Sequence, residues 1–495
     1  MSGNSQKEAA AHVWTRRGFV GALGLLIASR SNAMKGIKPA ADSDWRNDFP
    51  GRSVLKAEPD YEAWRQAMPW QMHTVERFPD MIVRPNTAAA IPGIITRARH
   101  QGQRVAIKSG GHNVSEAFLR NGGTLLDLGE LQAVNVDPET STVWVEPALW
   151  SHGLVRALEP HNLAFPVAHC ATVPMGGYLL GGGLGYNHDN WGTLACDSIL
   201  AAEVVLASGE KVIASPDSHP ELYWAVRGAG TGFFGVVTRY KLQLYKNPGT
   251  TQESSYIFPL SMLDEATSML QDWAASSPLD TELMMLLAHN PMATAETDPL
   301  DSKMCIVRAV TYAATAKDAG RELKKLGNHP STEKALMKNE RVSTSLSQMQ
   351  VESVNANMGL GFGHYAVDTV WTNRLPDVMR AIKQHFVNAN SAKTHFVVSP
   401  KMNRKLDGGA FSVIGDTFVG AYAMWDEASD TPASFNWLDG TSRLMRPLAV
   451  GQYINEVDAF RDTTAPKRCF SPETWKQLAQ LRKHYDPTGQ FFSWP

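Results

Sequence analysis

Two segments of the chain place reactive side chains beside runs of glycine. The segment HCATVPMGGYLLGGGLGY, from His169 to Tyr186, sets Cys170 ahead of six glycines, and KSGGHN sets His112 directly after a glycine pair. Glycines gather where a backbone turns sharply or approaches another group closely. Both segments therefore indicate close approach to a ligand.

A third glycine cluster, RGAGTGFFG at 227–235, contains the pattern G-x-G. A Rossmann fingerprint must open a helix after a strand, whereas these glycines lead into a strand-like segment, so the cluster is not an NAD site of that kind. Backbone N–H groups of such turns still form anion-binding nests. Three nests in one domain suit a long dinucleotide cofactor better than a small anion.

Composition excludes several classes of protein. A net charge of −2 and a charged fraction of 19% argue against a nucleic-acid partner. No apolar run after the N-terminus reaches the roughly 18 to 20 residues that cross a bilayer, which predicts a mature chain without a transmembrane segment. The four cysteines form no C-x-x-C pair and no metal-type spacing, and three disulfide pairings remain possible.

The N-terminus has the order of an export signal. Arg16 and Arg17 precede an apolar stretch at 19–28 and small residues at 31–33. A basic pair, then a short apolar core, then a cleavage site made of small residues predict a secretory signal over 1–33 rather than a membrane span. The paired arginines indicate the twin-arginine machinery as a partner, and hence a periplasmic or secreted protein.

Strands and helices on either side of the glycine-rich turns must hold these turns in position. Strands are expected at 81–85 and 104–109, a helix at 87–101, and a hairpin at 200–214. These elements predict an α+β domain that ends near residue 246. Longer helices then alternate with strands up to about residue 450, which predicts a second domain with an antiparallel sheet backed by helices.

Seven segments in order carry a family resemblance: FPDMIVRPNTAAAI, IKSGGHN, CATVPMGGYLLGGGLG, LAAEVVLASGE, HPELYWAVRGAGTGFFGVVT, QYINEVD and HYDPTGQFF. In them the chain resembles the FAD-linked oxidases of the vanillyl-alcohol-oxidase and p-cresol-methylhydroxylase type, in the branch of berberine bridge enzyme and the oligosaccharide oxidases. The resemblance implies a two-subdomain FAD-binding domain at 75–246, an inserted substrate domain at 247–450, and a C-terminal segment at 451–495 that returns to the FAD domain.

The resemblance also implies how the cofactor is held. His112 would bond to the flavin 8α-methyl and Cys170 to flavin C6, so the FAD would be bicovalent. If the family resemblance is set aside, His112 is interpreted as a turn-capping or buried histidine, and Cys170 as an unreactive small hydrophobic residue. The other cofactor contacts that the family's motifs indicate are Ser109, Gly110, Gly111, Asn113, Val173, Gly176, Gly177, Gly181, Gly182, Gly183, Gly235, Val236, Val237, Tyr453 and Asn455.

One departure from the family concerns the base that assists hydride removal. The tail motif is commonly Y-x-N-Y with its second tyrosine as base, whereas this chain reads YINE and places Glu456 there beside Tyr453. An ordinary glutamate has a pKa near 4.3, so Glu456 requires burial to raise its pKa. The alternative is a structural carboxylate bonded to backbone or to Arg461. Tyr178, where many relatives carry a histidine, is a further catalytic candidate.

Substrate contacts are expected on strands of the second domain, at Tyr365, Asp368 and Tyr422, with Asp416 and Trp425 as weaker candidates. Tyr422 and Met424 should share one face because strand side chains alternate. A plain core role for these aromatic residues is the alternative.

The expected reaction is transfer of a hydride from a C–H beside a hydroxyl of a carbohydrate or of another secondary or benzylic alcohol. Val173 stands where a small side chain admits oxygen in this branch, which favours an oxidase that forms hydrogen peroxide, although Pro174 replaces a usual glycine. Amine oxidation, oxidative cyclisation, and a dehydrogenase that uses a quinone or redox protein are the alternatives.

Overall fold

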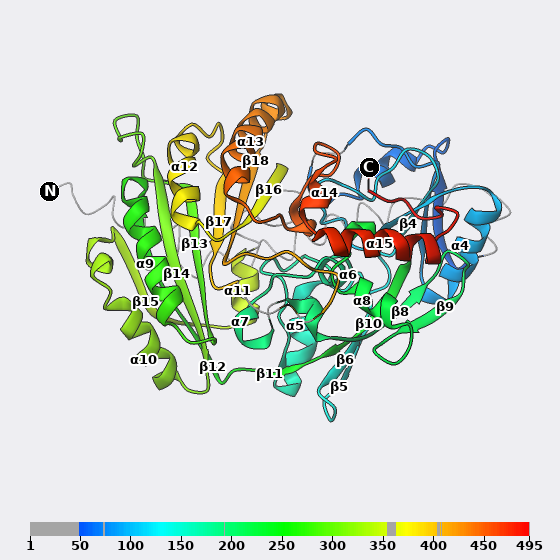
Figure 1. The fold of residues 1–495 in the computed structure, drawn as a ribbon, viewed down its shortest axis with the longest axis horizontal. Helices are drawn as coiled ribbons and strands as arrows, with labels where there is room; N and C mark the ends of the chain where they lie inside the picture. The colour runs from blue at the N-terminus through cyan, green and yellow to red at the C-terminus, as the bar shows by residue number, and fades with distance from the viewer. Residues whose placement is uncertain are drawn as a thin grey trace.

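The computed structural model describes residues 49–72, 75–192, 194–353, 363–402, 406 and 408–494. Figure 1 shows two domains side by side. The first domain contains β1 to β11 and the C-terminal segment, and the second contains β12 to α13. The predicted signal at 1–33 lies outside the described residues.

The first sheet of the first domain has four strands in the order β1-β2-β4-β3. Strands β2, β4 and β3 are parallel, and β1 pairs antiparallel with β2, so this domain starts at Gly51, before the expected boundary at residue 75. Helix α4 follows β2, where Pro92 suits the first turn of a helix. The elements are β1 (Gly51–Leu55), α3 (Tyr61–Gln66), β2 (Met81–Pro85), α4 (Ile91–His100), β3 (Val105–Lys108) and β4 (Thr124–Asp127).

The second sheet of this domain is antiparallel, in the order β5-β6-β10-β8-β9. The predicted hairpin is present as β8 and β9, and its turn uses Gly209 at φ +86°, a conformation that glycine adopts without strain. The elements are β5 (Val134–Asp137), β6 (Thr142–Val145), α5 (Ser151–Leu158), β7 (Leu163–Ala164), α6 (Met175–Leu180), α7 (His188–Trp191), β8 (Ile199–Val205), β9 (Lys211–Ala214), α8 (Pro220–Val226), β10 (Val236–Gln243) and β11 (Tyr245–Lys246).

The second domain contains the predicted antiparallel sheet, which has seven strands in the order β15-β12-β14-β13-β17-β18-β16. Helices α9, α10, α12 and α13 cover one face of this sheet (Figure 1). The elements are β12 (Thr250–Pro259), α9 (Leu263–Ser276), β13 (Thr281–His289), β14 (Lys303–Ala313), α10 (Ala316–Gly327), β15 (Met337–Thr344), α11 (Leu346–Ser353), β16 (His364–Thr372), α12 (Leu375–Val387), β17 (His395–Ser399), β18 (Thr417–Trp425) and α13 (Thr431–Met445).

The two faces of the large sheet differ in burial. On the helix-covered face, residues such as Leu283, Val307 and Phe396 are buried in one hydrophobic cluster. The opposite face meets the first domain, and there Trp371 contacts Tyr453 edge to face, with ring centroids 6.1 Å apart. The first domain therefore docks against the face that the helices leave free.

The C-terminal segment returns to the first domain. It contains a short 3-10 turn (Ile454–Glu456), α14 (Ala465–Arg468) and α15 (Pro472–Tyr485), whose first turn is capped by the Ser471 side chain. Beyond α15, Phe491 bridges to Val105 of β3. The last residues thus complete the edge of the sheet that carries His112.

All four cysteines are buried and free, so none of the three possible pairings is formed. Among the described residues, no helix combines the length and apolar character that a membrane crossing requires.

Candidate active site

A buried ion-pair triad fixes the base of the turn that carries His112. Asp127, at the end of β4, accepts hydrogen bonds from Arg84 Nε of β2 at 2.6 Å and from Lys108 Nζ of β3 at 2.9 Å. Burial opposes ionisation of Asp127, but the two cations hold the pKa of its carboxyl below the usual value. One carboxylate thereby joins three strands directly beneath the turn at 109–112.

His112 and Cys170 lie side by side, as the family resemblance requires. Cys170 Sγ is 3.8 Å from His112 Nε2, and Thr172 Oγ1 lies 3.0 Å from that nitrogen and 3.4 Å from the sulfur. Desolvation lowers the pKa of His112 to about 3 and raises the pKa of the Cys170 thiol. The pair is therefore a neutral imidazole beside a protonated thiol at neutral pH.

Trp70 covers this pair and was not predicted from the sequence. Its ring stacks on His112 with centroids 4.3 Å apart, and Tyr365 of β16 lies 4.4 Å away on tilted planes. The backbone N–H of Trp70 donates to Gly111 O at 2.9 Å. The aromatic stack links the His112 turn to the second domain, and no local motif in the sequence signals such a long-range contact.

The glycines near Cys170 mostly allow the protein to approach itself. A Cβ on Gly181 would lie 1.9 Å from Asn455 Oδ1, and one on Gly110 would lie 2.5 Å from the Pro174 ring. Gly111, Gly176, Gly182 and Gly183 are confined in the same way by Met68, Pro147, Phe411 and Tyr178. A Cβ on Gly177, by contrast, would meet no atom within 4 Å. Of these glycines, Gly177 is the one with room for a ligand beside it.

Tyr453 and Asn455 support the glycine loop from the C-terminal segment. The Tyr453 hydroxyl oxygen accepts hydrogen bonds from the backbone N–H groups of Gly183 (3.1 Å) and Leu184 (3.3 Å), and from Asn455 Nδ2 (3.1 Å). Burial also raises the pKa of Tyr453. These contacts give Tyr453 a positioning function rather than the catalytic function also predicted for it.

Tyr178 lies in the hydrophobic core of the first domain. Its hydroxyl donates to Pro166 O at 2.6 Å, and burial raises its pKa well above the ordinary value. A phenol whose proton is already donated to a backbone carbonyl is poorly placed to act on a substrate. The structure therefore favours packing over catalysis for Tyr178.

The remaining predicted cofactor contacts divide between turns and core. Asn113 Oδ1 accepts from Ser115 Oγ (2.8 Å) and Ala117 N (2.9 Å), which closes the turn after His112. Val173 is partly buried, and its carbonyl accepts from both the N–H and the hydroxyl of Ser151. Ser109 packs beside Gly176, whereas Gly235, Val236 and Val237 lie at the start of β10, where the two valines are buried in the core.

Glu456 lies on the same side of the first domain as the large sheet. Its Oε2 accepts a hydrogen bond from the Tyr422 hydroxyl of β18 at 2.8 Å. Desolvation raises the pKa of Glu456 to about 7, opposed by the Tyr422 hydrogen bond and by the charge of His169. Arg461, the alternative partner, instead donates to Asp439 at 2.6 Å. The raised pKa that a base at this position requires is thus present.

A second carboxylate enters from the large sheet and was also missed from the sequence. Glu282 of β13 forms an ion pair with His169 Nε2 at 2.7 Å and accepts from the backbone N–H of Asn187 (2.8 Å) and from the Tyr312 hydroxyl (3.1 Å). Burial opposes its ionisation, but the charge and hydrogen bond of His169 hold the pKa of Glu282 at about 2. This ionised carboxylate joins the residue before Cys170 to the second domain.

The strand candidates divide by the face to which they point. Tyr365 and Tyr422 face the first domain, where they contact Trp70 and Glu456. Asp368 points to the helix side and accepts hydrogen bonds from Ser442 of α13 and from Gln452 Nε2 at 2.5 Å. Asp368 lies three positions after Tyr365, so the two point to opposite faces, and the structure does not place Asp368 with the other predicted substrate contacts.

The weaker candidates lie away from the site. Trp425 points to the helix side, where its indole N–H donates to Thr431 at 2.9 Å. Asp416 precedes β18 and is exposed. Tyr422 and buried Met424 share a face, as predicted.

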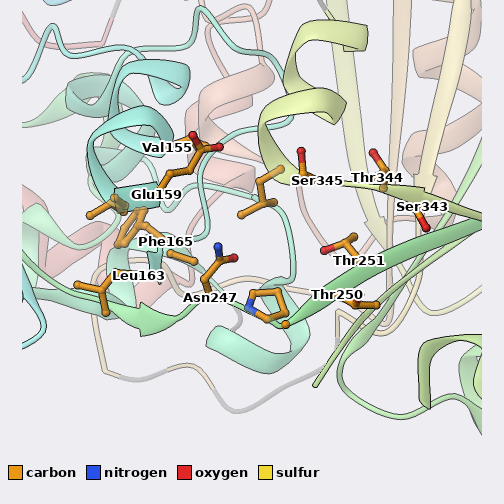
Figure 2. Close-up of a pocket in the computed structure, with 15 residues that line it drawn as sticks. Val155, Glu159, Leu163, Phe165, Asn247, Thr250, Thr251, Ser343, Thr344 and Ser345 are labelled. Atoms are coloured by element: carbon orange, nitrogen blue, oxygen red, sulfur yellow. The ribbon is translucent and has the colours of Figure 1, made fainter. Parts of the chain in front are cut away.

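A cavity of about 260 Å³ lies elsewhere between the two domains. Figure 2 shows side chains of α5 and β7 facing side chains of β12 and β15 across it. Its lining includes Glu159, Asn247 and Thr251 but none of His112, Cys170, Tyr422 or Glu456. This cavity is therefore separate from the candidate site.

The residues at the site fit a flavin. His112, His395, Tyr422 and Glu456 each retain some accessible surface although desolvation dominates their pKa values, a combination expected for side chains that line an internal cavity. Within the part of the chain that the structure describes, Gly177 adds open space beside the loop and the buried indole nitrogen of Trp70 has no hydrogen-bond partner. A flat ligand held by an imidazole and a sulfur suits this arrangement.

Sequence comparison supports the same cofactor. A sequence model described as an FAD binding domain matches residues 79–215. The chain is 27% identical over 455 residues to the FAD-linked oxidoreductase janO of Penicillium janthinellum, covering 90% of this chain and 96% of that protein. It is 24% identical to the xylooligosaccharide oxidase of Thermothelomyces thermophilus, covering 84% and 86%.

Structure comparison gives the fold. BBE-like 1 of Physcomitrella patens superposes with a TM-score of 0.76 at 18% identity, covering 91% of this chain and 98% of that one. An identity this low establishes the architecture but not the substrate. The architecture, the FAD-binding domain and the oxidoreductase relatives agree. The chain is an FAD-dependent oxidoreductase with an FAD-binding domain, and its fold is that of the berberine-bridge-enzyme-like flavoproteins.

Proposed function

We propose that the protein is an exported oxidase that converts a secondary or benzylic alcohol, R₂CH–OH, and O₂ into the carbonyl compound R₂C=O and hydrogen peroxide. The alcohol loses a hydride from carbon and a proton from oxygen, and O₂ receives both electrons and two protons. A bound flavin supplies the hydride acceptor. The site residues remove the proton and fix the position of the reacting carbon.

Buried Glu456 is the observation that carries this proposal. A carboxylate with a pKa of about 7 is half ionised near neutral pH, where general bases are most effective. The Tyr422 hydroxyl fixes its orientation and leaves Oε1 for a substrate hydroxyl. Glu456 therefore accepts the alcohol proton in the proposed reaction, in the place that tyrosine occupies in many relatives.

Replacing Glu456 tests the assignment. Glu456→Gln keeps the shape and a hydrogen-bonding group but removes the base, so the rate of anaerobic flavin reduction by an alcohol substrate should fall by on the order of a hundredfold. The measurement is stopped-flow absorbance of the flavin under nitrogen. Photoreduction of the same variant should proceed normally, and an unchanged rate with substrate would place the base elsewhere.

We also propose that His112 and Cys170 both bond covalently to the flavin. The 3.8 Å between His112 Nε2 and Cys170 Sγ brings both side chains to one place, which supports their attachment to nearby atoms of a single flavin ring system. Acid-precipitated wild-type protein should therefore give a yellow pellet, and each alanine variant should retain colour through the remaining bond. Only the double variant His112→Ala/Cys170→Ala should give a colourless pellet with free flavin in the supernatant. A colourless wild-type pellet would contradict the linkage.

Export rests on the sequence at 1–33. We propose that the twin-arginine machinery carries the folded protein to the periplasm or out of the cell. A covalently bound cofactor suits this route, since it would stay with the enzyme where free FAD is scarce.

A further inference from the structure

The face of the large sheet opposite the helices carries an apolar row beside the proposed base. Ile257, Ile306, Leu286 and Val397 are paired in register across β12, β14, β13 and β17. The next residue in the row is Gly420 of β18. The row thus ends at the strand that also carries Tyr422.

Among the described residues, these aliphatic side chains join no hydrophobic core. All four are partly exposed, while their neighbours along each strand are buried on the helix side. None of the four belongs to a hydrophobic cluster of the described chain or packs against one. Contiguous apolar surface that a fold leaves uncovered beside a reactive site is typical of a ligand-binding wall.

The charged groups nearest the row are already engaged, and His395, two residues from Val397 on the same face, stacks on Tyr422. Arg308 forms an ion pair with Glu253, and Glu282 is held by His169, Asn187 and Tyr312. A sugar ring carries a hydroxyl on most carbons, and each hydroxyl that enters a buried site without a partner costs binding energy. The row offers such hydroxyls no donor or acceptor side chain.

The dimensions limit the size of the ligand. Four adjacent strands span three spacings of about 4.8 Å, so the row extends over roughly 14 Å. At the end of the row the rings of Tyr422 and Phe418 cover Gly420, and the Tyr422 hydroxyl donates to Glu456. A flat body of roughly this length would have its end beside the proposed base.

We propose that the substrate is an apolar, fused-ring alcohol whose hydrocarbon body lies on the row of Ile257, Ile306, Leu286 and Val397 and whose hydroxyl-bearing carbon lies next to Tyr422 and Glu456. This inference rests on the proposed oxidation of an alcohol. It selects the apolar class over the carbohydrate class within that function.

The test compares two probes on the flavin-loaded protein. Binding of 9-anthracenemethanol, a fused-ring alcohol, and of xylobiose is measured under nitrogen by the change in flavin absorbance. We expect the fused-ring probe to bind at least tenfold more tightly. Tighter or equal binding of xylobiose overturns the proposal.

Two variants test whether the hydrocarbon part of the bound probe lies on the row. Leu286→Gln and the nearly isosteric Val397→Thr should each weaken 9-anthracenemethanol binding at least tenfold, at unchanged flavin content and thermal stability. Val342→Asn, which replaces an exposed valine on edge strand β15, is the matched control and should bind like wild type. Unchanged binding of the probe by both row variants overturns the proposal. The proposal is also overturned if wild type self-associates and Leu286→Gln dissociates it, because a second copy of the chain would then cover the row.

The Glu456→Gln variant separates this inference from the proposed function. It should bind 9-anthracenemethanol with wild-type affinity while losing flavin reduction. If wild type binds the probe as expected but no alcohol reduces its flavin, the apolar row is supported as the binding surface and the proposed reaction is contradicted. If alcohols reduce the flavin but the row variants bind the probe like wild type, the proposed reaction is supported and the apolar row is contradicted as the binding surface.

Discussion

The Tyr422 hydroxyl joins the carboxylate of the proposed base, Glu456, to the substrate-side sheet. A hydroxyl that donates to a carboxylate stabilises the ionised form, so the Tyr422 hydroxyl lowers the pKa of Glu456 against the larger effect of burial. Because the base must be ionised, flavin reduction should increase with pH through about 7.

The Tyr422→Phe variant should move the midpoint of this pH dependence of flavin reduction to higher pH. Loss of one hydrogen bond of about 1 kcal/mol corresponds to an upward pKa shift of somewhat less than one unit. Stopped-flow reduction between pH 5 and pH 9 measures the midpoint. Tyr365→Phe, which alters a ring that stacks on Trp70 instead, is the control and should leave it in place. A midpoint that Tyr422→Phe does not move would contradict the coupling.

Single residues could be predicted where a motif fixed their neighbours. The resemblance placed His112 with Cys170, and strand alternation placed Tyr422 with Met424. The same alternation separates Asp368 from Tyr365, so their placement on opposite faces could also have been predicted from the sequence. Trp70, His169 and Glu282 could not be predicted, since their roles arise from contacts between distant segments.

At the level of elements, Asp127 holds β2, β3 and β4 together beneath the His112 turn. Asp127→Asn would remove the buried carboxylate that pairs with both Arg84 and Lys108. Breaking a buried ion pair on one side costs about 3 to 5 kcal/mol, so the free energy of unfolding should fall by that amount. Urea unfolding at neutral pH measures the loss.

Glu130→Gln provides a matched control for that substitution. Glu130 also approaches Arg84, at 4.0 Å, but is substantially exposed, and exposed ion pairs contribute about 0 to 1 kcal/mol. Equal losses in the two variants would show that burial of Asp127 is not what stabilises the turn.

Local sequence patterns predicted the positions of helices and strands better than they predicted what the glycines contact. Helix α4 and the β8–β9 hairpin lie where spacing and turn residues predicted them. The glycines at 176–183 were expected to make room for a flavin, yet Gly181 and Gly182 make room for Asn455 and Phe411, which lie far from them in the sequence, and Gly183 makes room for nearby Tyr178. A glycine motif shows that something approaches the backbone, but not what approaches it.

At the level of the whole molecule, Glu282 joins the two domains at the loop of Cys170. The pKa of Glu282 is about 2 in the folded protein against 4.5 ordinarily, so its ionisation stabilises the fold fully above pH 4.5 and this stabilisation is lost as pH falls toward 2. The Glu282→Gln variant should be less stable than wild type by on the order of 3 kcal/mol at neutral pH. Urea unfolding at several pH values should show the difference shrinking below pH 4.5.

Glu253→Gln is the control within the same sheet. Glu253 and Glu282 both pair in register with Val310, but Glu253 binds Arg308 of its own domain. Its replacement should leave the acid dependence of stability close to wild type. An acid dependence that Glu282→Gln does not flatten would contradict the role of Glu282 as an ionised link between domains.

The return of the C-terminal segment sets the order in which the enzyme can be assembled. Phe491 joins the strand before the His112 turn, Arg120 donates to Ser493 O, and Glu456 arrives on the same segment. A ribosome still holding these residues in its exit tunnel withholds both the sheet edge and the proposed base. A chain truncated before residue 451 therefore lacks both the sheet edge and the proposed base, and we expect it to be inactive.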